Sequence, residues 1–183
     1  VTTECRRMGG AFGGKESQAA QWACLAALAA HVTGHPAKCR LDRDEDMAVT
    51  GKRHPFDVSY DVGFDDSGRI AGLDVTLASR CGFSADLSGP VNDRAVFHAD
   101  NAYWLPDVAI HSYRCRTNTV SDTAFRGFGG PQGMFAIEAV IDAIARATGL
   151  DPLDVRKANL YGTGERNVAP DGMTVENNIA PAL

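Results

Sequence analysis

The sequence has no closely spaced pair of cysteines. Its five cysteines are scattered, and the nearest two, Cys24 and Cys39, stand 15 positions apart. Zinc and iron–sulfur sites are built from thiolates roughly two to four residues apart, so the chain carries no such motif. An odd cysteine count without a dense framework is typical of a reducing compartment. We therefore expect free thiols and a cytoplasmic protein.

The sequence also lacks a basic charge balance and a long apolar run. It has 18 Lys and Arg residues against 23 Asp and Glu residues, a net charge of −5. We therefore expect no nucleic-acid partner, because such a partner requires a basic surface. The Ala-rich stretch near the start is broken by Gln21 and His31 before it reaches the ~18 apolar residues of a membrane span, so we expect no membrane association. No leader pattern begins at Val1, so no signal peptide is expected.

What the sequence does contain is a succession of helix and strand patterns. In the first half they predict a helix over 15–33 ended by Gly34, a short strand at 37–41, and a charged turn or one helical turn at 42–46. An antiparallel hairpin follows, with strands at 56–62 and 73–77 joined by the turn residues 65–68.

The second half begins with a predicted helix, capped by Asn92 or Asp93 and running to about Tyr103. Then follow a strand at 108–115, a helix with Pro131 in its first turn and an apolar stripe at 134, 137, 141 and 144, a stop at Gly149, a short helix capped by Asp151, and a loop after Tyr161. The pattern predicts an α+β fold with helices packed on a mixed or antiparallel sheet. Two units, each a glycine loop followed by a helix, face one ligand in this interpretation.

The first glycine loop, residues 9–16, nearly matches the phosphate-binding pattern Gly-x-x-x-x-Gly-Lys-Ser/Thr. It fails at Glu16, where a hydroxyl is needed for magnesium. A phosphate-binding module without catalysis therefore stays as an alternative. Glycines let backbone N–H groups approach an anion or an oxo ligand closely, and a following helix N-terminus adds positive potential. We expect Glu16 in the first helical turn, where either helix capping or function would explain it.

The second glycine loop, residues 123–132, combines Arg126 with two phenylalanines and three glycines just before a helix. An arginine offers a fork of donors to a phosphate or carbonyl oxygen. Phe125 and Phe128, flanked by glycines, can present their rings to a planar ligand, or else they are core residues.

The two loops together resemble the xanthine dehydrogenase and oxidase family of molybdenum hydroxylases. The first resembling segment is Arg7-Met8-Gly9-Gly10-Ala11-Phe12-Gly13-Gly14-Lys15-Glu16, the second is 123–134, and a third reaches Leu160. The resemblance implies that residues 1–165 are part of a domain binding molybdopterin (Mo), with 166–183 a loop or tail. Phe12, Gly13, Gly14 and Arg126 would contact the cofactor, with Phe12 and Arg126 near the molybdenum but not as side-chain ligands. Ala124, Phe125 and Phe128 would line the substrate pocket.

Two residues bear on the substrate that the resemblance implies. Purine-hydroxylating members have a glutamate where this chain has Glu16 and an arginine where it has Arg94, both counted as catalytic and substrate-binding, whereas aldehyde-oxidising relatives have apolar residues. An arginine at the exocyclic oxygen of the purine stabilises charge that grows in the transition state. The implied activity is oxidation of xanthine or hypoxanthine to urate. An aldehyde or another N-heterocycle is the alternative substrate.

The resemblance also implies partners that this chain does not contain. Electrons would pass to 2Fe-2S clusters, FAD and NAD on other domains or subunits of a hetero-oligomer. The base glutamate of the family is outside the chain, and Glu165 does not take its place. We therefore expect a piece of a longer protein that is inactive alone, with apolar surface exposed around its loops. Ala11 stands where many relatives have glycine, and it would be strained if that position needs a positive φ.

Overall fold

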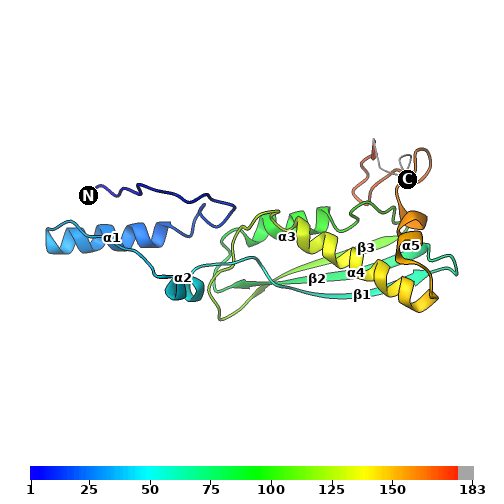
Figure 1. Ribbon diagram of the computed structural model, residues 1–183, viewed down its shortest axis with the longest axis horizontal. Coiled ribbons are helices and arrows are strands. Elements are labelled where there is room, and N and C mark those ends of the chain that lie inside the picture. Colours follow the sequence, from blue (N-terminus) through cyan, green and yellow to red (C-terminus); the bar gives the residue numbers. More distant parts are fainter. Residues whose placement is uncertain (177–183) are drawn as a thin grey trace.

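A three-stranded mixed sheet forms the centre of the computed structural model, which describes residues 1–176 (Figure 1). Strand β1 (Phe56–Phe64) and strand β2 (Ile70–Gly82) pair antiparallel, with Tyr60 opposite Val75. The turn between them is held by Asp65, whose carboxylate accepts hydrogen bonds from the Ser67 and Arg69 backbone N–H groups at 2.9 and 3.1 Å. The predicted hairpin is confirmed.

The third strand makes the sheet mixed. Strand β3 (Val108–Arg116) runs parallel to β2, and the order is β1-β2-β3. Parallel neighbours need a crossover connection, and helix α3 (Ser88–Phe97) lies in this one. The predicted helix from Asn92 or Asp93 to Tyr103 is wrong at both ends. Asn92 is buried inside α3, where its side chain bonds Ser79 and the Ser88 carbonyl instead of capping a helix.

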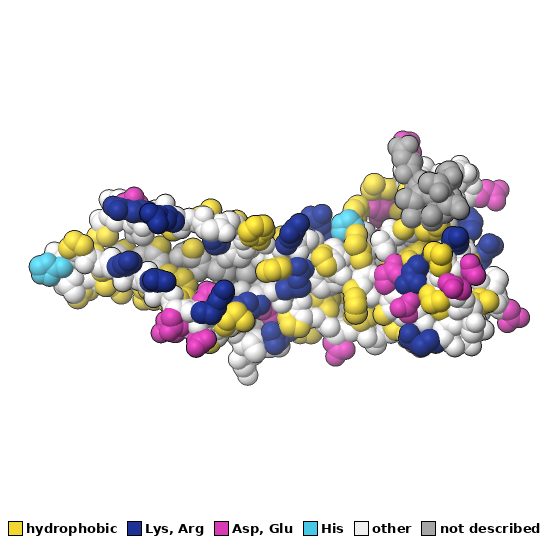
Figure 2. Space-filling view, viewed as in Figure 1, with side chains coloured by type: hydrophobic (Ala, Val, Ile, Leu, Met, Phe, Trp, Pro, Cys, Tyr) yellow, Lys and Arg dark blue, Asp and Glu magenta, His cyan; other side chains and the backbone are white. Residues whose placement is uncertain are grey.

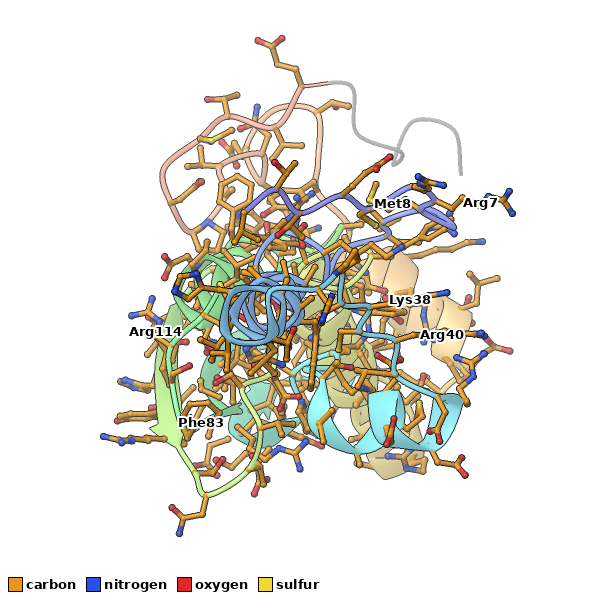
Figure 3. The ribbon with its side chains drawn as sticks, turned by 90° about the vertical axis from the view of Figure 1, so that its left-hand side faces the viewer. Arg7, Met8, Lys38, Arg40, Phe83 and Arg114 are labelled. Atoms are coloured by element: carbon orange, nitrogen blue, oxygen red, sulfur yellow. The ribbon has the colours of Figure 1, made fainter. Side chains whose placement is uncertain are left out.

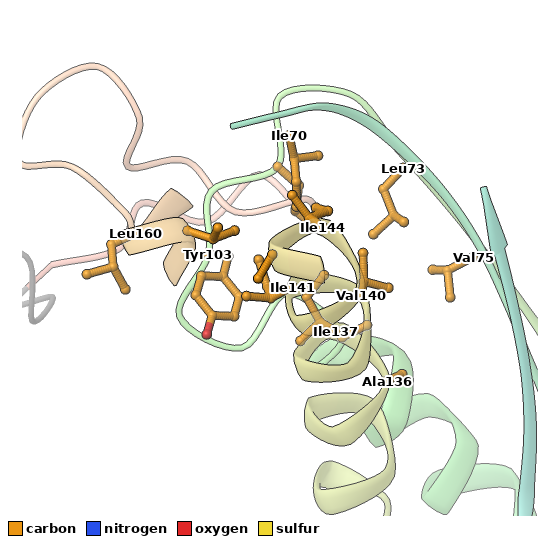
Figure 4. Close-up of a cluster of buried hydrophobic side chains, with 14 of the residues drawn as sticks. Ile70, Leu73, Val75, Tyr103, Ala136, Ile137, Val140, Ile141, Ile144 and Leu160 are labelled. Carbon is orange, nitrogen blue, oxygen red and sulfur yellow. The ribbon is translucent and has the colours of Figure 1, made fainter. Parts of the chain in front are cut away.

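The core lies between the sheet and helix α4 (Gly130–Thr148), as Figure 4 shows. Ile137, Ile141 and Ile144 are each at most 2% exposed, since successive turns of the helix direct them to one face. The predicted stripe is confirmed for these three residues, whereas Met134 is 37% exposed. Helices α3 and α4 pack on the mixed sheet, so the predicted α+β fold is confirmed.

Helices α3 and α4 approach closely through glycine. A Cβ on Gly133 would stand 2.1 Å from the Ala95 carbonyl oxygen, and one on Gly129 would stand 1.9 Å from that of Val91. No side chain fits at either position, so the backbone of α3 packs directly on the first turn of α4. The C-terminal part is fixed by α5 (Pro152–Asn159), where the Asp151 side chain accepts from the Leu153 N–H as the predicted N-cap.

The N-terminal part projects away from this body (Figure 1). Helix α1 (Ala20–Thr33) has no buried residue, although most of its side chains are apolar, and it ends at Gly34 as predicted. It begins five residues later than predicted. The expected strand at 37–41 does not form. Of the two alternatives for 42–46, the helical one is confirmed, as part of the longer helix α2 (Arg43–Val49), with Asp42 and Glu45 forming a capping box.

From Tyr161 to residue 176 the chain is irregular apart from one isolated bridge, between Val168 and Thr174. The predicted loop or tail extends over residues 177–183, which lie outside the described part of the chain.

Candidate functional site

The first glycine loop is a run of left-handed backbone. Gly10, Phe12, Gly13 and Gly14 have φ of 95°, 48°, 81° and 87°. Phe12 is 64% exposed. Ala11 does not have a positive φ, so its methyl group causes no backbone strain, and the unusual φ falls on Phe12 instead.

The second glycine loop has the same kind of backbone. Gly127, Phe128 and Gly129 have φ of 91°, 51° and 95°, and the Phe128 N–H donates to the Phe125 carbonyl at 2.7 Å. Ala124 is buried, Phe125 is 46% exposed and Arg126 is exposed. A left-handed non-glycine residue costs roughly 1–2 kcal/mol, and such residues cluster at functional sites.

The two loops touch each other, although more than 100 residues separate them in the sequence. A Cβ added to Gly13 would lie 2.7 Å from the Ala124 carbonyl oxygen and 2.8 Å from the Phe125 Cα. One added to Gly14 would lie 3.8 Å from the Thr123 Cγ2. Gly13 is therefore a place where only glycine allows the backbones to meet, and the loops form one site.

Arg94 is carried to the same region by α3. The ring of His98, one turn later on α3, lies against Gly130 at the end of the second loop, where an added Cβ would be 3.1 Å from the ring. The Nε of Arg94 donates to the Nε2 of His98 at 3.3 Å. Within residues 1–176 the terminal guanidinium nitrogens of Arg94 make no hydrogen bond, and the side chain is exposed.

The prediction that Glu16 lies in the first turn of a helix is wrong. It is an exposed residue in a bend, four residues before α1 begins, so helix capping does not explain it. In the described part of the chain its carboxylate has no hydrogen-bond or ion-pair partner. The neighbouring side chains hold this segment instead: Ser17 and Gln18 both donate to the carboxylate of Asp86, at 2.7 and 2.6 Å.

Sequence reasoning missed the residues that fix the loops. Gln18 also accepts from the Gly51 N–H at 2.8 Å, and Asp86 has φ of 40°, which marks a constrained turn. Arg53 stacks on the ring of Phe125, with its guanidinium carbon 4.5 Å from the ring centroid. No local pattern signals these roles, because each partner is distant in the sequence.

A buried histidine lies beneath the second loop. His54 is 2% exposed, and its Nε2 is 2.7 Å from the Ser88 hydroxyl on α3. Burial lowers the pKa of His54 below the usual value, against the opposing effect of the nearby Asp122 carboxylate. The imidazole is therefore neutral at physiological pH and serves as a packed, hydrogen-bonded residue.

Backbone N–H groups of glycines can approach an anionic or oxo-bearing group closely. In the first loop, Gly9 has no atom within 4 Å of an added Cβ and the nearest to Gly14 is at 3.6 Å, whereas the Phe12 ring covers Gly10 and the Ala124 carbonyl covers Gly13. Figure 2 shows Lys and Arg side chains gathered where the N-terminal part meets the body. Figure 3 shows Arg7, Lys38 and Arg40 on one side of the molecule and Arg114 on the opposite side.

Apolar side chains are exposed around the site, as expected for a piece of a longer protein. They include Met8 at 65%, Phe12 at 64% and Phe125 at 46%. Among residues 1–176, no three His, Cys, Asp or Glu side chains are grouped so that they could hold a metal ion. In the same range no helix has the length and apolar character needed to cross a membrane.

The sequence resembles known proteins along most of its length. Xanthine dehydrogenase/oxidase of Gallus gallus is 50% identical over 165 residues, which cover 90% of this chain and 12% of that protein. Nicotinate hydroxylase of Emericella nidulans is 44% identical over 166 residues, which cover 91% of this chain and 12% of that protein. The chain therefore spans about one eighth of the length of these relatives.

A solved structure shares the fold. The aldehyde oxidoreductase from Desulfovibrio gigas superposes with a TM-score of 0.82 at 30% sequence identity, covering 96% of this chain and 19% of that one. Residues 1–160 match the sequence profile of the molybdopterin cofactor-binding domain. This match includes both glycine loops and α3, and it confirms the resemblance drawn from the loops. The chain belongs to the molybdopterin cofactor-binding domain family.

Proposed function

We propose that this chain is part of a molybdenum hydroxylase that oxidises xanthine or hypoxanthine to urate. The observation that carries the proposal is the direct contact of the two glycine loops at Gly13 and Ala124, with Arg94 on α3, the helix that packs on the second loop. In this arrangement Phe12, Gly13, Gly14 and Arg126 hold the molybdopterin group. The chemistry that this group supplies when bound is oxygen insertion and removal of two electrons.

The residues of this chain bind and orient the purine. The rings of Phe125 and Phe128 pack on the planar heterocycle, beside the small Ala124. The terminal guanidinium nitrogens of Arg94, which make no hydrogen bond within residues 1–176, donate to the exocyclic oxygen, where negative charge grows during the reaction. Glu16, which has no partner in the described residues, accepts from a ring N–H and can move a proton between ring nitrogens.

Another N-heterocycle is the second candidate substrate. A nicotinate hydroxylase is 44% identical to this chain, so relatives of similar distance act on different heterocycles. An aldehyde is less well suited to the site, since it carries no N–H group to donate to the Glu16 carboxylate. A phosphate-binding module without catalysis would leave both residues unexplained.

The further partners belong to the same proposal. Electrons from this site would pass to 2Fe-2S clusters, FAD and NAD, carried by other domains or by subunits of a hetero-oligomer. The protein acts in the cytoplasm, where its free thiols stay reduced.

The substrate is tested by substitution in the full-length, molybdenum-loaded protein. We expect Glu16→Ala and Arg94→Met each to lower kcat/KM for xanthine by about 100-fold, and to leave aldehyde oxidation within about threefold, because one charged contact in the transition state contributes roughly 3 kcal/mol. Glu165→Gln is the matched control, an exposed glutamate remote from the loops in the sequence. Equal losses for both substrates would contradict the assignment to purines.

A further inference from the structure

Arg53 makes two contacts with the second glycine loop. Its Nη2 donates to the Arg126 carbonyl at 2.6 Å, and its guanidinium lies over the ring of Phe125 at 4.5 Å from the centroid. One side chain thus fixes both a peptide group and an aromatic ring of the loop. A merely solvated arginine would make neither contact.

The backbone around Arg53 is itself attached to the second loop and to α4. The Thr123 N–H donates to the Lys52 carbonyl at 3.0 Å, and the Gln132 side chain donates to the His54 carbonyl at 3.2 Å. The residues before and after Arg53 therefore grip the loop near both of its ends. Arg53 stands between these attachments, so its guanidinium projects from a fixed base.

The geometry of Arg53 also restricts what could replace it. A guanidinium is planar, and it can lie flat on a ring while its edge donates to a carbonyl, whereas an ammonium is a point charge that cannot do both in this way. Its Nη1 is buried without a hydrogen-bond partner within residues 1–176, so the plane of the group is held by the Nη2 bond and the ring contact.

We infer that Arg53 is a positioning residue, which sets the ring of Phe125 and the peptide of Arg126 and thereby the preference for planar substrates. The inference rests on the proposed function, because it takes Phe125 as a wall of the substrate pocket. Arg53 need not touch the substrate. It limits the orientations of the ring, so that a flat heterocycle meets a preformed surface.

The first test follows the conformation of the loop and does not depend on turnover. In the full-length, molybdenum-loaded protein, we expect Arg53→Gln to raise the amide hydrogen-exchange rates of residues 125–129 by at least about tenfold, because two restraints on the loop are lost. Arg69→Gln is the matched control, since Arg69 is exposed and its side chain makes no hydrogen bond or ion pair within residues 1–176. Unchanged exchange in Arg53→Gln would overturn the inference.

The second test separates positioning from general destabilisation. We expect Arg53→Gln to raise KM for xanthine about tenfold, with kcat and molybdenum content within about threefold of the parent and KM for a small aliphatic aldehyde unchanged. Arg53→Lys, which keeps a cation near the ring, should give an intermediate KM. Equal changes in KM for both substrates, or a loss of molybdenum in both variants, would overturn the inference.

A double substitution tests whether Arg53 acts through Phe125. If Arg53 acts through Phe125, then Arg53→Gln combined with Phe125→Leu should raise KM for xanthine no further than the larger single effect. Multiplied effects would show that the two residues act independently and would overturn the inference. Absence of both xanthine and aldehyde turnover in the unsubstituted protein would defeat the proposed function alone, and the exchange experiment would still decide whether Arg53 holds the loop.

Discussion

Replacement of Gly13 by alanine perturbs the contact on which the site depends. The added Cβ would stand 2.7 Å from the Ala124 carbonyl oxygen, whereas ordinary contacts begin at 3.4 Å, so the loops must separate by about 3.4 − 2.7 = 0.7 Å. The φ of 81° adds strain of roughly 1–2 kcal/mol. A misplacement of this size near reacting groups can lower a rate by about 100-fold.

Alanine variants of two neighbouring glycines distinguish the effect of the steric clash from that of the backbone strain. Gly14 has a φ of 87° but its nearest Cβ contact is 3.6 Å, so Gly14→Ala introduces strain without a clash. Gly9 has neither a positive φ nor an atom within 4 Å of an added Cβ. In kcat/KM for xanthine we expect losses of about 100-fold for Gly13→Ala, about tenfold for Gly14→Ala and less than twofold for Gly9→Ala.

The assay is steady-state turnover of the full-length protein, with molybdenum content measured for each variant. If Gly13→Ala behaved like Gly9→Ala, then the contact between the loops would not matter, and the account of the site would be refuted. If Gly13→Ala and Gly14→Ala were equal, then strain alone would explain the loss.

Two further predictions concern the framework below the loops. Gly133→Val should lower the thermal midpoint of the parent protein by several degrees and raise KM for xanthine, as measured by calorimetry and steady-state kinetics. The reason is that a side chain 2.1 Å from the Ala95 carbonyl forces α3 and Arg94 away from the second loop. The control Gly89→Ala, where an added Cβ has no atom within 4 Å, should change neither the thermal midpoint nor KM. The lowered pKa of His54 means that the unfolded chain binds more protons, so stability should be full above about pH 6.5 and fall as the pH drops below it, by at most about 1.4 kcal/mol per pH unit. Denaturant unfolding at pH 5.5 and 7.5 should show this fall in the free energy of unfolding, and His54→Gln should reduce it. If His54→Gln leaves the pH dependence of stability unchanged, then other groups cause it.

Local patterns were sufficient for the parts of the fold that local interactions determine. The hairpin has a two-residue period on both strands and a turn closed by Asp65. Helix α4 has its stripe and its glycine stop, and α5 has Asp151 as a cap. In each case the signal and its partner lie within a few residues of each other, so the sequence shows both.

Two of the wrong predictions concern side chains that bond to other parts of the fold. Asn92 has the chemistry of a helix cap, but inside α3 its side chain accepts a hydrogen bond from the Ser79 hydroxyl and donates one to the Ser88 carbonyl. The segment at 37–41 has strand-like residues, but it is not one of the three strands of the sheet. Helix α1 starts late because Ser17 and Gln18 turn to Asp86, nearly 70 positions away in the sequence.

Separation along the sequence also decides which parts of the site the sequence showed. The glycine loops stand out because each is a compact motif, and together they identified the family. The residues that hold them, among them Arg53, Gln18 and Asp86, carry no signal of their own. Their roles depend on contacts between segments that meet only in the folded chain.

The central claim is that the two loops, joined at Gly13, form part of a molybdenum site that oxidises purines. The most direct measurement is made on the full-length protein, purified with its partner subunits, for molybdenum content and for xanthine-dependent reduction of NAD. The account predicts about one molybdenum per chain together with urate formation. A fully assembled, well-folded protein that contains no molybdenum, or that contains molybdenum and leaves xanthine unchanged, would contradict it.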